Sequence, residues 1–461
     1  MNNPDEFIST SVDDLQPRIW GAASDIWKFA ELGFKEGRSA DRLIAELEAD
    51  GFRIERGLAD MPTSFIATAG SQDGPVIAIL AEYDALPEMS QEAVAYQKRR
   101  EGQVHGHACG HHIFGAAAMG AGLALKRWID ATGAKAQIRV YGTPAEEGGA
   151  GKTFMVRAGL FDDVDICLHW HPAAYNMTWS SPCLAMVAGK FDFSGRAAHA
   201  AGYPELGRSA LKAVEAMNVM VNMMREHIPS DARIHYTIDH GGAAPNIVPD
   251  FAQAYYMVRH PNAKVTLELL ERVKKAAEGA AIGTETSFEF RQRIGHYDML
   301  PNVVLGELVH RVQHEVGGVT LDAEETEFAQ EIQKTLVGNI PPLASLEDIL
   351  PFDANHMVSG STDVGDISWV VPTVGFFAST WVPGTLAHSW QATAAGGTGI
   401  ASKGGIVAAK VLALTALNLI RNPDLIVAAR DEFEKRRGEG FVYKSLMEDI
   451  GTPDLNYWNN A

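Results

Sequence analysis

The segment GHACGHH, residues 106–112, gathers metal-binding and reactive side chains in a chain with only three cysteines among 461 residues. Cys109 and His111 are two residues apart, so an extended or turn conformation can point both side chains to one side. A thiolate and an imidazole together suit a borderline metal ion such as zinc. Two other interpretations stay open here. Both side chains could be buried packing residues, or Cys109 could be a nucleophile with His111 as its base.

Two adjacent carboxylates and two histidines follow predicted strands further along the chain. Glu146 and Glu147 come after a strand predicted at residues 137–141, and His169 and His171 end a strand in VDICLHWHP. In parallel α/β sheets, ligands collect outside the carboxyl ends of the strands, so these turns should converge with GHACGHH. One carboxylate of the pair could then bind a metal ion while its neighbour accepts a proton from water.

Either histidine of HWHP could reach this site if the strand persists. We favour His171, because Pro172 ends the strand and fixes that side chain. Far downstream, the loop LAHSWQ adds His388. The resulting set offers five protein ligands, enough for two adjacent divalent ions: Cys109, His111, Glu147, His171 and His388.

The elements that carry these residues indicate an α/β fold. Residues 75–81, PVIAILA, form an apolar run, which is typical of a strand in a parallel sheet covered on both faces by helices. GHACGHH leads into FGAAAMGAGLALKRW, whose small residues suit a helix packed closely on that sheet. Strands that alternate with helical stretches predict a layered α/β architecture.

The pattern changes from about residue 185. Strand and helix signals then follow in the order β-α-β-β-α-β, which is the split βαβ arrangement of a ferredoxin-like α+β sandwich. Strands and helices like those of the first part resume in PTVGFFAST and GGIVAAKVLALTALNLI. We therefore expect a discontinuous catalytic domain, residues 1–184 and 300–461, with a second domain inserted at residues 185–299.

Composition narrows the functional classes. The formal net charge of −19 opposes binding to nucleic acid and to anionic membranes, and no run of basic residues provides a local exception. Three cysteines make a disulfide framework improbable and favour a reducing compartment. The first residues do not resemble a signal peptide, and the most apolar stretch is interrupted by Lys410. We expect a cytoplasmic protein without a membrane span.

Seven motifs in this order resemble the amidohydrolase branch of the M20 metallopeptidases, near its aminobenzoyl-glutamate hydrolase subunits and aminoacylase-1-like proteins. The motifs are GHACGHH, GTPAEEGG, HWHP, FSGRAAHAA, GGAAPNIVP, STDVGDISW and LAHSWQ. The resemblance implies a two-metal aminopeptidase-like catalytic domain with a mixed sheet, and an inserted lid domain that also dimerises. It implies the same five metal ligands as above, with two zinc or manganese ions, and Glu146 as general base.

Further roles come from the resemblance alone. It implies that His199 reaches across a dimer to polarise the scissile carbonyl, and that Asn246 and Arg259 hold substrate. An arginine suits a carboxylate because its planar fork can donate two hydrogen bonds. An intradomain salt bridge is the alternative for Arg259. Asp363 could orient a ligand histidine or cap a helix.

The sequence departs from the wider family in AEYDALPE, where Glu82 stands in place of a metal-binding histidine. This change is similar to the amidohydrolase branch, in which the cysteine compensates. His112 remains an alternative ligand.

The implied reaction is metal-dependent hydrolysis of the amide bond of an N-acyl or N-aroyl amino acid with a free carboxylate, as in aminobenzoyl-glutamate. The alternatives are a dipeptidase with the same chemistry, or a non-catalytic subunit of a heteromeric amidohydrolase. The expected assembly is a homodimer, with a heteromer containing a related subunit as the alternative.

Overall fold

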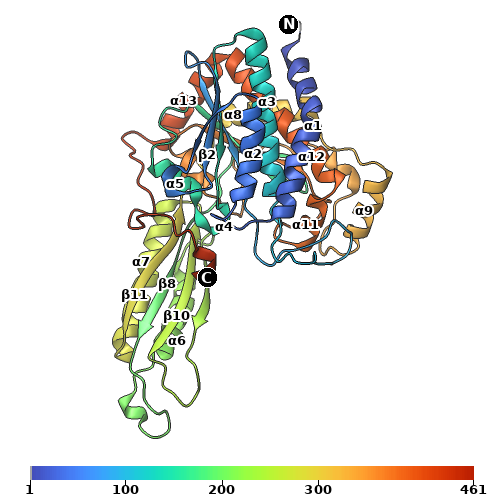
Figure 1. The fold of residues 1–461 in the computed structure, drawn as a ribbon. Coiled ribbons are helices and arrows are strands. Elements are labelled where there is room, and N and C mark those ends of the chain that lie inside the picture. Colours follow the sequence, from blue (N-terminus) through green and yellow to red (C-terminus); the bar gives the residue numbers. More distant parts are fainter. Residues whose placement is uncertain (1–2, 461) are drawn as a thin grey trace.

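The computed structural model describes residues 3–460 and has two parts, a broad α/β domain and a narrower domain that projects from it (Figure 1). The projecting part is formed by the green and yellow middle of the chain, while the blue and red ends of the chain build the broad part together. The middle of the sequence is therefore an insertion, which is the arrangement predicted above.

The broad domain is built on a mixed eight-stranded sheet in the order β1-β2-β4-β3-β5-β12-β6, with β7 paired to β12. The strands β3, β4, β5 and β12 form parallel pairs along its centre, as the apolar sequence of residues 75–81 predicted. The strand bounds are β1 Arg53–Arg56, β2 Phe65–Gly70, β3 Val76–Ala81, β4 Gln137–Gly142, β5 Ile166–Leu168, β6 His171–Ala173, β7 Met177–Trp179 and β12 Thr373–Ser379.

Helices pack against this sheet and against one another. Helix α3 contacts β3 and β4, and the small residues along it let α1 and α12 approach closely. The helix bounds in this domain are α1 Pro4–Phe29, α2 Gly37–Ala49, α3 His111–Thr132, α4 Glu146–Gly149, α5 Gly151–Arg157, α8 Val303–Val316, α9 Ala323–Gln333, α10 Val364–Ser368, α11 Trp390–Gly396, α12 Gly399–Arg421 and α13 Pro423–Arg437.

The inserted domain, called the lid below, has the predicted β-α-β-β-α-β order. Its elements are β8 Ala185–Ser194, α6 Ala210–Met224, β9 Arg233–His240, β10 Phe251–His260, α7 Ala263–Thr284 and β11 Ser287–His296. The antiparallel sheet runs β11-β8-β10-β9, so the first and third strands are central, as in a ferredoxin-like sandwich. The lid has its own apolar core between this sheet and α6 and α7. The fold class predicted from the sequence is confirmed.

Helix α12 is the one helix within residues 3–460 that is long and apolar enough to cross a membrane. However, 83% of its most apolar window is buried inside the protein, against α3, α1 and α8. Burial of this kind is typical of a central core helix. The three cysteines are free thiols, and all are buried.

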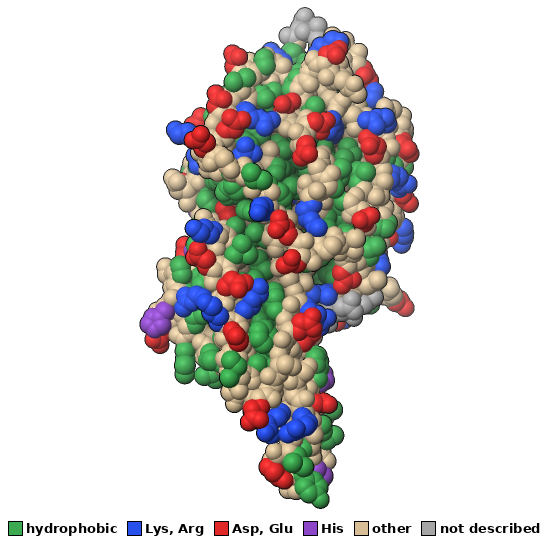
Figure 2. All heavy atoms as spheres, turned by 90° about the vertical axis from the view of Figure 1, so that its left-hand side faces the viewer, with side chains coloured by type: hydrophobic (Ala, Val, Ile, Leu, Met, Phe, Trp, Pro, Cys, Tyr) green, Lys and Arg blue, Asp and Glu red, His purple; other side chains and the backbone are tan. Residues whose placement is uncertain are grey.

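The surface carries both signs of charge. On the face shown in Figure 2, acidic and basic side chains are interspersed over the broad domain and the lid, and no large basic patch is visible there.

Candidate metal centre

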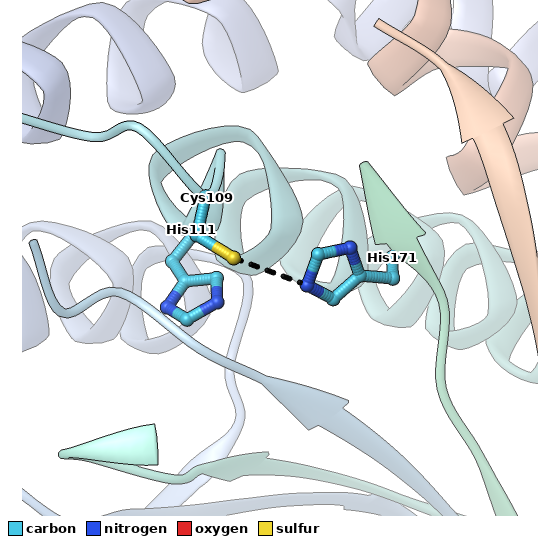
Figure 3. Close-up of side chains that lie close together, drawn as sticks. All are labelled: Cys109, His111 and His171. Carbon is cyan, nitrogen blue, oxygen red and sulfur yellow. Dashed lines mark hydrogen bonds between the residues drawn. The ribbon is translucent and has the colours of Figure 1, made fainter. Parts of the chain in front are cut away.

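All five predicted ligands come together at the carboxyl ends of the central strands, with Glu146 beside them. Three overlapping groups have ligand atoms within 4.8 Å of one another: Cys109, His111 and His171; Cys109, Glu147 and His388; and His111, Glu146 and Glu147. Figure 3 shows the first group, in which Cys109 Sγ lies 3.5 Å from His171 Nε2. Four chain segments far apart in sequence therefore meet at one point.

Gly110 allows the first two ligands to face this point. It has φ of 80°, a conformation that favours glycine, and a Cβ atom there would lie 2.6 Å from the ring of Pro172. The close contact joins the GHACGHH loop to the segment that carries His171. The other two histidines of the motif serve packing, since His107 hydrogen-bonds the carbonyl of Ile26 and His112 that of Gly396. His112 is thus outside the ligand cluster.

Asp84 connects two of the ligand-bearing segments. Its carboxylate accepts a hydrogen bond from Nδ1 of His111 at 2.8 Å and from the backbone N–H of Glu147 at 2.9 Å. This contact fixes the His111 ring so that Nε2 points into the cluster, an arrangement typical of metal-binding histidines. Burial alone would lower the pKa of His111, but the charges of Cys109, Asp84 and Glu82 raise it well above its usual value.

The turn that carries Glu146 and Glu147 rests on a buried carboxyl group. Ala145 is in the left-handed region with φ of 58°, and its N–H donates to Glu36 Oε1 at 2.9 Å. The other oxygen of Glu36 accepts from the hydroxyl of Thr63. Burial raises the pKa of Glu36 to about 8. A strained turn held from beneath in this way places two adjacent carboxylates at fixed positions.

Glu147 and His388 form a direct pair. His388 Nε2 lies 3.1 Å from Glu147 Oε1, and the backbone N–H of His388 donates to the carbonyl of Ala108. Burial would raise the pKa of Glu147, but the contact with His388 lowers it to about 2. The same contact raises the pKa of His388. The downstream loop therefore closes the cluster by touching both Glu147 and the GHACGHH segment.

Glu146 has the opposite electrostatic environment. Burial raises its pKa well above the usual value, and the charges of Glu82 and Glu147 add to this effect. Two neighbouring carboxylates with pKa values pushed apart are suited to different tasks, one as a permanent anion and one as a proton carrier.

The strand before HWHP does not persist through this motif. Both histidines could have reached the site only if it had. β5 ends at Leu168, and β6 begins at His171 and pairs with a later part of β12. His171 donates through Nδ1 to the carbonyl of Pro172, which leaves Nε2 facing Cys109. His169 instead packs edge-on against Trp179. Of the two histidines, His171 is the one within the cluster.

Asp363 lies beside the cluster but touches no histidine. Its carboxylate accepts from both the backbone N–H and the ammonium group of Lys152, at 2.9 and 2.7 Å. Lys152 also pairs with Glu82 at 2.7 Å, and all three side chains are buried. The expectation that Asp363 orients a ligand histidine is wrong. Asp363 is the N-cap residue of α10, where its side chain makes no cap hydrogen bond, and its carboxylate instead accepts from a first-turn N–H of α5. It also balances a buried lysine.

The donor set fits divalent metal ions. It combines one sulfur, imidazole nitrogens and carboxylate oxygens, which suit zinc or manganese. His111 Nε2 faces Glu82 Oε2 at 3.2 Å, and Glu147 Oε1 faces His388 Nε2 at 3.1 Å. In the described part of the chain the buried atoms of His111, Glu82 and Glu147 still make no well-oriented hydrogen bond, a costly state that a cation would relieve. Burial and the charge of Glu147 raise the pKa of Cys109 well above its usual value, which disfavours a nucleophilic thiolate.

A cavity of about 790 Å³ opens from the cluster toward the lid. On the lid side it is lined by Arg259, among others, whose guanidinium contacts Met257 Sδ at 2.8 Å. Within residues 3–460 no ion pair is formed by Arg259, so the alternative of an intradomain salt bridge is not found. A half-buried cation that faces a cavity without a carboxylate partner is a suitable site for an anionic ligand.

His199 and Asn246 lie apart from the cavity of their own chain. Both are exposed and lie next to each other, since a backbone bridge joins His199 to Ile247 and the N–H of Ala200 donates to the carbonyl of Asn246. His199 Nδ1 accepts from the N–H groups of Ala201 and Gly202, which turns Nε2 outward. Neither side chain lines the cavity.

Several supporting residues were not identified from the sequence: Asp84, Glu36, Lys152 and Tyr457. Asp84 carried one signal, because it follows the carboxyl end of β3, where ligands of parallel sheets gather. Tyr457 donates its hydroxyl to the carbonyl of Glu147 at 2.8 Å across 310 residues of sequence. Such contacts leave no local pattern.

The comparisons with known sequences agree with this geometry. A family model described as a peptidase dimerisation domain matches residues 185–285. A subunit of the p-aminobenzoyl-glutamate hydrolase of Escherichia coli (strain K12) is 39% identical over 456 residues, which cover 93% of this chain and 94% of that protein. The Xaa-Arg dipeptidase of Mus musculus is 29% identical, and the match covers 92% of this chain and 90% of that protein.

A solved structure has the same fold. A dinuclear metal-binding peptidase from the M20 family of Bacillus subtilis superposes with a TM-score of 0.62 at 18% identity. The match covers 89% of this chain and 99% of that one, so both the broad domain and the lid are included.

Proposed function

This chain belongs to the M20 metallopeptidase family, in its amidohydrolase branch, and we propose that it hydrolyses the amide bond of N-aroyl or N-acyl amino acids with a free carboxylate, such as aminobenzoyl-glutamate. It is a metal-dependent hydrolase; the two relatives are named as a hydrolase subunit and a dipeptidase, and the M20 structure as a dinuclear metal-binding peptidase. The observation that carries the substrate class is the cavity lined both by residues of the ligand cluster and by the guanidinium of Arg259, which forms no ion pair within residues 3–460.

We propose two zinc or manganese ions as cofactors. Cys109, His111, Glu147, His171 and His388 would hold them, and the buried donors of His111 and Glu147 that lack well-oriented partners support this assignment. When bound, such ions supply Lewis acidity, which acidifies water and polarises a carbonyl oxygen.

The protein's own residues divide the remaining work. Glu146 accepts the proton of the attacking water at its carboxylate and returns it to the leaving amine, a double task that suits a carboxyl group with a raised pKa. Arg259 binds the carboxylate of the amino-acid part. His199 of a second copy would donate to the carbonyl oxygen as charge develops there, and Asn246 would help to hold substrate.

Activity of the purified chain tests this proposal. After addition of zinc or manganese, N-(4-aminobenzoyl)-glutamate should be hydrolysed, and a chelator should abolish turnover. Iodoacetamide added to the metal-loaded enzyme should have a smaller effect, because the Cys109 thiol is buried and engaged as a ligand. Failure to cleave any N-acyl or N-aroyl amino acid with metal bound would exclude the proposed substrate class.

A dipeptidase is the second candidate, because the Xaa-Arg dipeptidase covers nearly the whole chain. Free-amine dipeptides with arginine at the carboxyl end should be tested beside the acylated amino acids. The chain could also need a related subunit for activity, since the 39%-identical relative is named as one subunit of a hydrolase. Activity of the chain alone, together with its mass in solution, distinguishes a homodimer from a heteromer with a required partner. For location, the free thiols support the cytoplasm.

A further inference from the structure

The residues that follow α13 cross the junction between the two domains. We call residues 441–458 the strap. Figure 1 places the red C-terminal end of the chain next to α4, where the lid meets the broad domain. The strap touches the base of the lid at three places: Gln292 donates to the carbonyl of Leu446 at 2.6 Å, Tyr297 to that of Lys444 at 2.9 Å, and Arg293 pairs with Asp454 at 3.0 Å.

The strap is also attached to the broad domain. Arg157 donates to the carbonyl of Ile450 at 2.7 Å, and Lys35 donates to the side chain of Asn456 at 2.8 Å. The hydroxyl of Tyr457 donates to the backbone carbonyl of Glu147, one of the predicted metal ligands. A segment without regular secondary structure along most of its length is thus held at both domains beside the cavity.

The strap supplies part of the wall of the cavity. Ile450, Asp454, Tyr457 and Trp458 all line it, together with Phe34 from the loop before α2. The ring of Tyr457 stands edge-on to Phe34 at 5.7 Å and lies 4.8 Å from the ring of Trp458.

Gly33 makes room for this aromatic group, because a Cβ atom at that position would overlap the Tyr457 hydroxyl. Three aromatic rings therefore meet at one side of the substrate cavity, and two of them come from the strap.

We infer that the strap is a specificity element, in which Tyr457 and Trp458 select an aryl group on the acyl side of the substrate. This inference rests on the proposed function. Two other cations line the cavity, but Lys190 is paired with Asp239 and Arg293 with Asp454. Arg259 is therefore the suited partner for the substrate carboxylate, and the aromatic wall of the strap is left for the acyl part. Aromatic rings favour an aryl partner by stacking as well as by burial.

The test compares two substrates that differ only in the acyl group, N-(4-aminobenzoyl)-glutamate and N-acetylglutamate. In Tyr457→Ala, KM for the aroyl substrate should rise about tenfold, and KM for the acetyl substrate less than about twofold. Tyr457→Phe keeps the ring and should keep the wild-type ratio of the two kcat/KM values. Tyr96→Ala removes an exposed tyrosine outside the cavity and serves as the matched control.

Binding of 4-aminobenzoate, measured by calorimetry on the metal-loaded protein, gives a readout that needs no turnover. Its Kd should rise about tenfold in Tyr457→Ala and also in Trp458→Ala, which covers the case in which the first variant does not fold. Equal losses for both substrates, or an unchanged Kd in a folded variant, would overturn the inference. If the wild type cleaves neither substrate, the proposed function fails, and the Kd comparison still decides the role of the strap.

Discussion

The ligand cluster and the tip of the lid differ in how completely one chain builds them. At the cluster, each predicted ligand is buried or held by a neighbour: Asp84 fixes His111, and His388 fixes Glu147. At the tip of the lid, His199 and Asn246 are exposed and line no cavity of their own chain. On the proposed mechanism one chain would hold the metal ions by itself, whereas polarisation of the substrate carbonyl through His199 would need a second chain.

The two regions should therefore control different properties of the enzyme. Changes at the cluster should affect metal binding, proton transfer, or both, in a single subunit. Changes at the tip of the lid should reduce turnover without altering metal content, and they should be corrected by a different subunit. The following substitutions test that division, in order of expected effect.

Glu146→Gln should have the largest effect, because it removes the proton acceptor and keeps the shape of the side chain. We expect kcat to fall roughly 10²–10⁴-fold. Metal content, measured by elemental analysis, should stay that of the wild type, since Glu147 and not Glu146 is the proposed ligand of the pair. Glu324→Gln, on the exposed start of α9, is the matched control. Turnover near the wild-type value with metal bound would remove Glu146 from the mechanism.

His199→Ala should lower kcat by roughly 10²–10³-fold, the usual loss for one donor to a developing oxyanion. Metal content and KM should change little, because the side chain lies outside the cavity of its own chain. His227→Ala, which removes another exposed histidine of the lid, is the control.

Mixing two inactive variants then tests whether His199 acts across subunits. A hybrid of His199→Ala and Glu146→Gln chains has one site with both residues intact. Random reassembly should therefore restore about a quarter of the wild-type activity in a symmetric dimer. No recovery after verified exchange of subunits would show that His199 does not serve a partner's site.

Asp84→Asn tests the support beneath the cluster. An asparagine side chain is uncharged and has one acceptor oxygen, so it cannot accept hydrogen bonds from both His111 and Glu147 as the carboxylate does. The His111 ring then loses its fixed orientation. We expect metal affinity to fall about 10–100-fold, measured by competition with a chromogenic chelator. Asp162→Asn changes an exposed carboxylate and is the control. Unchanged affinity would mean that the His111 ring is positioned without Asp84.

The two regions also differ in how far the sequence predicts them. The ligand cluster could be assembled from residue types and from the rule that strand ends of a parallel sheet converge, which brought Glu147 and His171 to Cys109. The break between β5 and β6 was not visible, because His169-Trp170-His171 continues the apolar alternation of a strand. β5 and β6 pair with the same strand, β12, in one continuous register, so the interruption at residues 169–170 does not shift the strand.

Charges that pair over long distances were the weakest part of the prediction. Asp363 was expected either to orient a ligand histidine or to cap a helix, and its carboxylate also balances the ammonium group of Lys152, which is 211 residues away. Nothing local distinguishes a carboxylate that supports a ligand from one that neutralises a buried ammonium group. The position of the strap could not be predicted for the same reason. Its aromatic contact between Tyr457 and Phe34 joins distant parts of the chain and follows no periodic sequence pattern.

Arg259→Lys should have the smallest effect. Unlike His199, Arg259 lies in the part of the lid that lines the cavity of its own chain. Lysine keeps the positive charge and loses the planar fork, so one of two hydrogen bonds to a substrate carboxylate disappears. We expect KM for N-(4-aminobenzoyl)-glutamate to rise roughly tenfold while kcat stays within about threefold of the wild type. Arg53→Lys on the exposed strand β1 is the control. If KM does not change, the carboxylate is bound elsewhere in the cavity. The same measurement can be made with a substrate analogue in which the carboxylate of the amino-acid part is replaced by an amide. If Arg259 binds that carboxylate, Arg259→Lys should change KM for this analogue little.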